Sequence, residues 1–333
     1  MAVKFGVIGV GGFSFNRSLP AFLNADHFEL AAIMDAVSEN VKNASEKFSV
    51  PENKCYHNVD DLLADPDVEA VMISTPVHTH AALALKAIES GKHVFSEKPL
   101  GRTTAEAEKV VAAADKNRIK LGVGFHLRFH VLHQKAKELI DDGSFGNVNL
   151  IRMQNHLNYP EIVGAWRQNP EMSGGGGPSI DVGSHHIDLM CYLTGSPVKE
   201  ITAVAANQVH KYKVEDISLI LLRFENGTLG MMDLSWNIPH RFNVFEVYGS
   251  KASLYCEKTV GPFRDPYARL LTGDKIEELT PEYQDTYTIE AEAFARWIEY
   301  DEPFLIQGTE GIVNNRLLEK VNEAILTKKT IVV

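Results

Sequence analysis

The chain shows two patterns of apolar and polar positions, one on each side of residue 125. In the first part, short runs that are mostly apolar, such as residues 3–10 and 69–75, alternate with segments of helical character, such as residues 76–91 and 103–117. Mostly apolar runs are typical of parallel strands buried on both faces, and helices connect such strands. We therefore predict that residues 1–125 form a Rossmann domain, a doubly wound parallel sheet of the α/β class.

The second pattern begins after a turn-rich stretch at residues 141–147. Long segments that read as strands follow one another from there, and Asn226-Gly227 is a strong hairpin signal. These features predict an α+β domain at residues 126–333 with a large open, mostly antiparallel sheet. Helices at residues 286–300 and 308–327 close the chain, and we expect them to pack back on the first domain. A sheet face that no helix covers would be buried against another subunit.

Composition and charge narrow the possible functions. The chain has 333 residues, 44% of them hydrophobic, and a formal net charge of −11. Nucleic-acid-binding surfaces are usually basic, so this charge argues against a nucleic-acid partner. No apolar run approaches the ~18 residues of a membrane helix, and the first residues read as a strand rather than a signal peptide. Three scattered cysteines suit neither a disulfide framework nor a zinc motif. We expect a cytoplasmic protein without a membrane partner.

A glycine-rich turn between the first strand and the first helix is typical of a dinucleotide site. Gly9 suits the tight turn and Gly11 lets the backbone approach a pyrophosphate, which the amides of the following helix can bind. Gly12 and Phe13 continue the turn, and Ser14 stands where the usual motif has its third glycine. The turn lies between a strand and a helix, and the second strand that follows ends in an acidic residue. This order strengthens the interpretation of the turn as a dinucleotide site.

That acid, Asp35, is expected to accept hydrogen bonds from the adenosine ribose. A carboxylate repels a 2′-phosphate, and Ala36 and Val37 offer no cation, so we favour NAD over NADP. The alternative is that Asp35 caps the helix that follows.

Other polar residues follow later strands of the first domain, where open α/β sheets bind ligands. Ser74, Thr75 and His78 come after one strand, and His80 reads as a surface residue of the next helix. Glu97 and Lys98 end another strand, and Pro99 leaves the Lys98–Pro99 bond able to be cis. His126 and Arg128 follow the last strand and complete a set of candidate ligand contacts.

A glycine-rich approach and Pro178 predict a helix over residues 178–193. Asp181, His185, Asp188 and Tyr192 fall in one stripe of that helix, and the rest of its surface is apolar, as in a buried helix. Asp181 is placed to orient His185, which would act as a general base. A satisfied polar network, a metal site and a solvent-facing stripe are the alternatives, and we assign no metal.

The chain resembles the glucose–fructose oxidoreductase / inositol dehydrogenase / MocA family over essentially its whole length. The motifs that carry the resemblance are Glu97-Lys98-Pro99, Trp166-Arg167 and the glycines followed by Asp181-x-Gly183-x-His185-x-x-Asp188. The resemblance implies a catalytic triad of Lys98, Asp181 and His185, a bound NAD(H) or NADP(H), and a homodimer or homotetramer formed through the C-terminal sheet. It also suggests that Tyr287 reaches the nicotinamide.

The expected reaction is hydride transfer between the nicotinamide and a secondary hydroxyl of a sugar, inositol or related polyol. The substrate-side candidates are Lys98, His126, His156, Tyr159, Trp166, Arg167, Asp181, His185 and His240. The cofactor-side candidates are Gly9, Gly11, Gly12, Phe13, Ser14, Asp35, Ser74, Thr75, His78, Glu97, Lys98, Arg128 and Tyr287. Two alternatives stay open: an NAD-dependent glycosidase that oxidises its substrate transiently, and a non-catalytic dinucleotide or sugar sensor.

Overall fold

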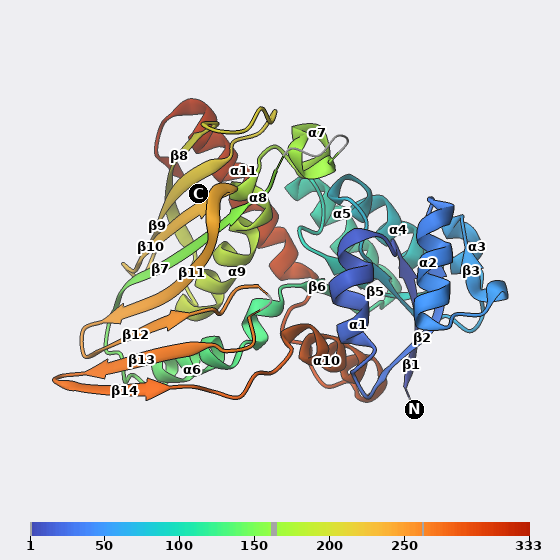
Figure 1. Cartoon of the computed structure of the whole chain (residues 1–333), viewed down its shortest axis with the longest axis horizontal. Helices are drawn as coiled ribbons and strands as arrows, with labels where there is room; N and C mark the ends of the chain where they lie inside the picture. Colours follow the sequence, from blue (N-terminus) through green and yellow to red (C-terminus); the bar gives the residue numbers. More distant parts are fainter. Residues whose placement is uncertain (1, 161–164, 262) are drawn as a thin grey trace. The chain divides into compact units, whose positions relative to one another are not determined.

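The computed structural model describes residues 2–160, 165–261 and 263–333 and divides into two compact units (Figure 1). One unit contains the residues up to His126 together with Asp285–Asn315, and the other contains Leu127–Gln284 and Arg316–Val333. The division therefore cuts through the last helix, α11 (Gly308–Thr327), whose residues are shared by the two units.

The first unit is built on a six-stranded, all-parallel sheet, which confirms the predicted Rossmann fold. The strand order is β3-β2-β1-β4-β5-β6, so the direction of winding reverses between β1 and β4, where such sheets bind ligands. The strands are β1 (Val3–Ile8), β2 (Phe28–Met34), β3 (Cys55–Tyr56), β4 (Ala70–Ile73), β5 (His93–Glu97) and β6 (Leu121–Gly124). The helices are α1 (Leu19–Phe22), α2 (Ser38–Phe48), α3 (Val59–Leu63), α4 (His80–Glu89), α5 (Thr104–Asn117) and α10 (Thr286–Tyr300), and α10 packs on α1, β1 and β2.

The helix after β1 begins with a turn wider than that of an α-helix. A π-helical turn, Ser14–Ser18, leads directly into α1, in which Pro20 is the second residue. The amide of Leu19 bonds the carbonyl of Ser14, five residues back. Pro20 has no amide hydrogen to donate, and its ring clashes with the carbonyl four residues earlier. The wider turn accommodates both effects within one continuous segment.

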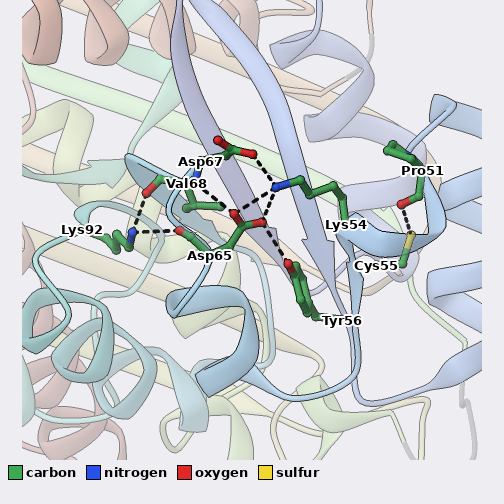
Figure 2. A network of polar contacts seen from close by, with 8 residues as sticks. All are labelled: Pro51, Lys54, Cys55, Tyr56, Asp65, Asp67, Val68 and Lys92. Atoms are coloured by element: carbon green, nitrogen blue, oxygen red, sulfur yellow. Dashed lines mark hydrogen bonds and ion pairs between the residues drawn. The ribbon is translucent and has the colours of Figure 1, made fainter.

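A buried carboxylate joins β3, α3 and the start of β4 within this unit (Figure 2). The Asp65 side chain is 2% exposed and accepts hydrogen bonds from Lys54 Nζ (2.9 and 3.0 Å), Tyr56 Oη (2.9 Å) and the Asp67 amide (3.0 Å). Burial raises the pKa of Asp65, but these hydrogen bonds outweigh it and hold the pKa below its usual value. The network should therefore stabilise the fold through the ionised form of Asp65.

Replacing Asp65 with asparagine is expected to lower the free energy of unfolding by about 1–3 kcal/mol at pH 7, because charged hydrogen bonds are lost. A carboxyl whose pKa is lowered by folding stabilises the protein above its unfolded-state pKa, ~3.9, and this contribution disappears as the pH falls through the folded-state value. Urea unfolding should show a constant difference from wild type between pH 7 and about 4, and a smaller one below. Asp67→Asn is the control, because Asp67 also contacts Lys54 but is 54% exposed, and it should cost less than about 1 kcal/mol. Equal losses in the two variants would contradict the prediction.

The second unit contains a nine-stranded sheet in the order β14-β13-β12-β11-β7-β10-β9-β8-β15. All neighbouring strands are antiparallel except β7 and β10, which confirms the mostly antiparallel sheet. The strands are β7 (Val148–Asn158), β8 (Val198–Ala206), β9 (Ile217–Phe224), β10 (Leu229–Ser235), β11 (Asn237–Gly249), β12 (Ala252–Glu257), β13 (Tyr267–Thr272), β14 (Lys275–Leu279) and β15 (Ile331–Val332). Asn226-Gly227 forms the turn between β9 and β10, with Gly227 at φ +91°.

One face of this sheet forms the core of the second unit. Apolar side chains of β7–β13 are buried there with those of α6 (Val131–Asp141), α9 (Gly183–Thr194) and the part of α11 from Leu317 to Ala324. Side chains alternate along a strand, so the opposite face carries the exposed residues Val204, Leu219, Leu221 and Leu229. No helix among the described residues is long and apolar enough to cross a membrane.

Candidate active site

The turn after β1 has a backbone that only glycine suits. Gly9 has φ +91°, and a Cβ atom there would lie 2.7 Å from the Ser74 carbonyl oxygen and 2.7 Å from Thr75 Cγ2. Gly12 has φ +36°, and a Cβ there would meet no atom within 4 Å, so the turn is open on that side. Ser14 is fully buried, in keeping with a small residue packed under the helix. These features fit the dinucleotide turn that the sequence predicts.

Asp35 is held against this turn. Its Oδ2 accepts a hydrogen bond from the Val10 amide (3.0 Å), and its Oδ1 accepts one from the Val37 amide (2.9 Å). Helix α2 begins at Ser38, and its N-cap residue is Val37. Asp35 therefore does not cap α2, and its carboxylate is fixed beside the glycine turn, where a ribose would be bound.

His80 is not the surface residue that we predicted. It is 1% exposed, with one ring nitrogen 2.8 Å from the Thr75 carbonyl oxygen and the other 2.8 Å from that of Pro99. Burial lowers the pKa of its imidazole. The prediction was wrong because the start of α4 is covered by the chain after β5, a long-range contact that helical periodicity does not reveal. His80 thus ties the end of β4 to Pro99, which follows Lys98 through a cis bond.

Tyr287 lies in an aromatic cluster of the first unit, in which Tyr287 and His126 are buried. Its ring stacks on His126 with centroids 4.1 Å apart, meets Phe13 edge-on at 5.8 Å and lies 4.4 Å from the Arg17 guanidinium. Burial, followed by the charge of Glu97, raises the pKa of Tyr287 well above its usual value. The cluster brings together Phe13, His126 and Tyr287, three residues that the sequence analysis named.

Two further residues join this cluster that the sequence analysis did not identify. Arg17 donates hydrogen bonds to both carboxylate oxygens of Asp285, at 2.7 and 3.0 Å, and Asp285 caps α10 by accepting from the Tyr287 amide. The two residues are 268 positions apart in the chain, so no local pattern pointed to the pair.

In the second unit, the predicted helix over residues 178–193 is broken at Val182. Helix α8 (Pro178–Asp181) ends there and α9 begins at Gly183. Ser184 Oγ donates to the Asp181 carbonyl (3.0 Å), and the His185 amide reaches back only to Val182. A serine hydroxyl competes with the backbone for a carbonyl, and glycine weakens a helix, so the break has a local cause.

The polar stripe is therefore divided between two environments. Asp181 and His185 are half-buried, and Arg167 Nε lies 3.5 Å from Asp181 Oδ2. Asp188 is buried and accepts two hydrogen bonds from Arg128, at 2.9 and 2.6 Å. The guanidinium of Arg128, a predicted cofactor contact, is thus held in place by Asp188. Among the described residues, no three His, Cys, Asp or Glu side chains are grouped to hold a metal ion.

The remaining substrate-side candidates of the second unit differ in their surroundings. His156 is buried, with Nε2 3.0 Å from Asp233 Oδ1, and this hydrogen bond lowers the pKa of Asp233. Arg167 stacks on Trp166 at 4.2 Å, and Tyr159 packs on Trp236, whose ring is buried. His240 is exposed on β11. Lys98 lies at the end of β5 in the first unit.

Comparison with known proteins gives this arrangement a context. The model of an oxidoreductase family with an NAD-binding Rossmann fold matches residues 3–125, and that of the GFO/IDH/MocA C-terminal domain matches residues 133–255. The chain is 27% identical to myo-inositol 2-dehydrogenase of Thermotoga maritima, covering 93% of this chain and 92% of that one. It is 27% identical to scyllo-inositol 2-dehydrogenase (NADP(+)) of Bacillus subtilis, covering 99% and 95%. The crystal structure of aldose-aldose oxidoreductase from Caulobacter crescentus has the same fold, with a TM-score of 0.92, 24% identity and full coverage of both chains.

Proposed function

This chain belongs to the GFO/IDH/MocA family of oxidoreductases, and we propose that Lys98, Asp181 and His185 carry its reaction. The protein is an NAD(P)-dependent dehydrogenase of a sugar, an inositol or a related polyol. The observation that supports the assignment best is the divided stripe: Asp188 is buried against Arg128, whereas Asp181 and His185 are both partly exposed, one at the end of α8 and one in α9. A partly exposed imidazole four residues from a carboxylate is suited to proton transfer.

In the proposed mechanism, His185 accepts the proton of the substrate hydroxyl while a hydride leaves the carbon that bears this hydroxyl. Asp181 orients the imidazole and stabilises its protonated form. The ammonium of Lys98 stabilises the negative charge that develops on the substrate oxygen. A bound nicotinamide dinucleotide supplies the hydride acceptor, and the glycine turn, the amides of the helix after it and Asp35 are the residues that would hold it. Arg128, whose guanidinium pairs with Asp188, stays a proposed member of this set.

The reaction is tested by following NADH or NADPH formation at 340 nm with a panel of free sugars, inositols and sugar acids. Net reduction of the dinucleotide by a free polyol supports the dehydrogenase. Turnover of a glycoside without net reduction would support the NAD-dependent glycosidase, and cofactor binding without any turnover would support a sensor.

We further propose NAD as the preferred cofactor, because the Asp35 carboxylate is fixed beside the turn by the Val10 and Val37 amides. A 2′-phosphate at that place would face a negative charge. Asp35→Asn keeps an oxygen that can accept one of these hydrogen bonds and removes the charge. It is expected to shift the ratio of kcat/KM for NAD to that for NADP by about tenfold towards NADP, equal to ~1.4 kcal/mol. Asp26→Asn, which changes an exposed carboxylate of the same unit, should leave the ratio unchanged. A wild-type preference for NADP would contradict the assignment.

We also propose that the chain forms a homodimer or homotetramer through the C-terminal sheet. The support is the face of the nine-stranded sheet opposite its core, where Val204, Leu219, Leu221 and Leu229 are exposed on neighbouring strands β8, β9 and β10. An apolar patch on adjacent strands is typical of a protein–protein interface.

A further inference from the structure

The short helix α8 receives its cap from a residue far along the chain. Glu215 Oε1 accepts hydrogen bonds from the Gly177 amide (2.9 Å), the Ser179 amide (3.0 Å) and Ser179 Oγ (2.5 Å). The N-cap residue of α8 is Gly177, which has no side chain to cap with, and Pro178 has no amide hydrogen. One carboxylate oxygen therefore satisfies the donors at the start of α8.

The backbone of Glu215 also lies directly against the start of α8. A Cβ atom on Gly177 would be 2.3 Å from the Glu215 carbonyl oxygen, so a larger residue could not occupy this position without displacing one of the two segments. The contact between the segments is thus made by both the main chain and the side chain of Glu215. This close approach explains the glycine immediately before Pro178.

The segment that carries Glu215 is rigidly held by its neighbour. Asp216 is fully buried and accepts hydrogen bonds from the amides of Gln208, Val209 and His210 and from Asn237 Nδ2, at 2.8–3.0 Å. Its carbonyl oxygen accepts from the Trp236 amide (2.8 Å), and its own amide donates to Ala206 (3.0 Å). The main chain at Glu215 is therefore anchored to the ends of β8 and β10 and serves as a fixed point for α8.

The fixed point matters because α8 is only four residues long and ends in Asp181. The series of helical hydrogen bonds is interrupted at Val182 before α9 presents His185, although the backbone of Val182 stays helical (φ −84°, ψ −40°). Their relative position depends on how α8 is placed, and the hydrogen bonds of Glu215 place its first turn. From this geometry we infer that Glu215 is a positioning residue for the reaction, holding Asp181 in register with His185; the inference rests on the proposed function of these two residues.

The test compares Glu215→Ala with Glu215→Gln in the steady-state oxidation of a substrate identified from the polyol panel. Glu215→Ala is expected to lower kcat about 10- to 100-fold, the loss typical of a displaced catalytic group, with an unchanged KM for NAD. Glu215→Gln keeps an oxygen acceptor and should recover most of kcat. Glu225→Ala, an exposed carboxylate at the β9–β10 turn, is the control and should behave as wild type.

A second measurement separates positioning from mere stability. If Glu215 acts through Asp181, adding Glu215→Ala to Asp181→Asn should lower kcat by less than about threefold, because coupled residues are not additive. A 10- to 100-fold loss of kcat on adding Glu215→Ala to the Asp181→Asn variant would overturn the inference. A wild-type kcat in Glu215→Ala, measured alongside an inactive His185→Ala, would also overturn it. An active His185→Ala would instead show that the proposed function is wrong.

Discussion

His185→Ala is expected to lower kcat by about 10²–10⁴-fold, the usual contribution of a positioned general base. The Kd for NAD should stay at its wild-type value, because the glycine turn and Asp35 belong to the first unit and His185 to the second. Lys98→Met should produce a loss of similar size, since the developing charge on the substrate oxygen loses its ammonium. Stopped-flow single turnovers with saturating NAD would measure the chemical step, and fluorescence titration would measure cofactor binding.

The histidines of the chain provide a matched control for this result. His57→Ala removes an exposed imidazole from the first unit and should leave kcat unchanged. His186→Ala is unsuitable as a control, because His186 is fully buried and burial lowers its pKa to about 3, so its replacement would disturb packing. Near-wild-type turnover by His185→Ala on the true substrate would refute the catalytic assignment.

The local patterns of the sequence were sufficient for the parallel sheet of the first unit. Its strands are mostly apolar and its helices begin at recognisable positions, so the sheet and the turn at Gly9 could both be predicted. The long antiparallel strands of the second unit were also visible. Strands β13 and β14 give a weaker signal, because their exposed residues show little apolar alternation.

The features that the sequence did not reveal depend on contacts between distant residues. Helical periodicity placed Asp188 and His185 on one stripe, but it could not show that Arg128, sixty positions earlier, pairs with Asp188. It likewise could not show that Glu215 caps α8 across thirty-six positions. The resemblance to the family named Lys98, Asp181 and His185 because each stands in a short motif, whereas positioning residues such as Glu215 have no motif of their own.

Breaking the Arg128–Asp188 pair is expected to have the largest effect on stability. The side chains are 7% and 2% exposed, and the guanidinium also lies over the Tyr192 ring at 5.0 Å. Arg128→Met leaves the Asp188 carboxylate buried without its cation, which should lower the free energy of unfolding by about 3–5 kcal/mol. Asp188→Leu should be equally harmful, because it leaves the guanidinium buried. Urea unfolding followed by circular dichroism would measure both losses.

The double variant Arg128→Met/Asp188→Leu distinguishes an unpaired charge from a packing defect. If the loss in each single variant comes from an uncompensated buried charge, removing both charges should restore most of the stability, since two apolar side chains of similar size can replace a buried ion pair. If the loss comes from packing, the double variant should be less stable than either single variant. Arg223→Met supplies the control within the same unit: its ion pair with Glu200 is 58% and 34% exposed, and its loss should cost at most about 1 kcal/mol.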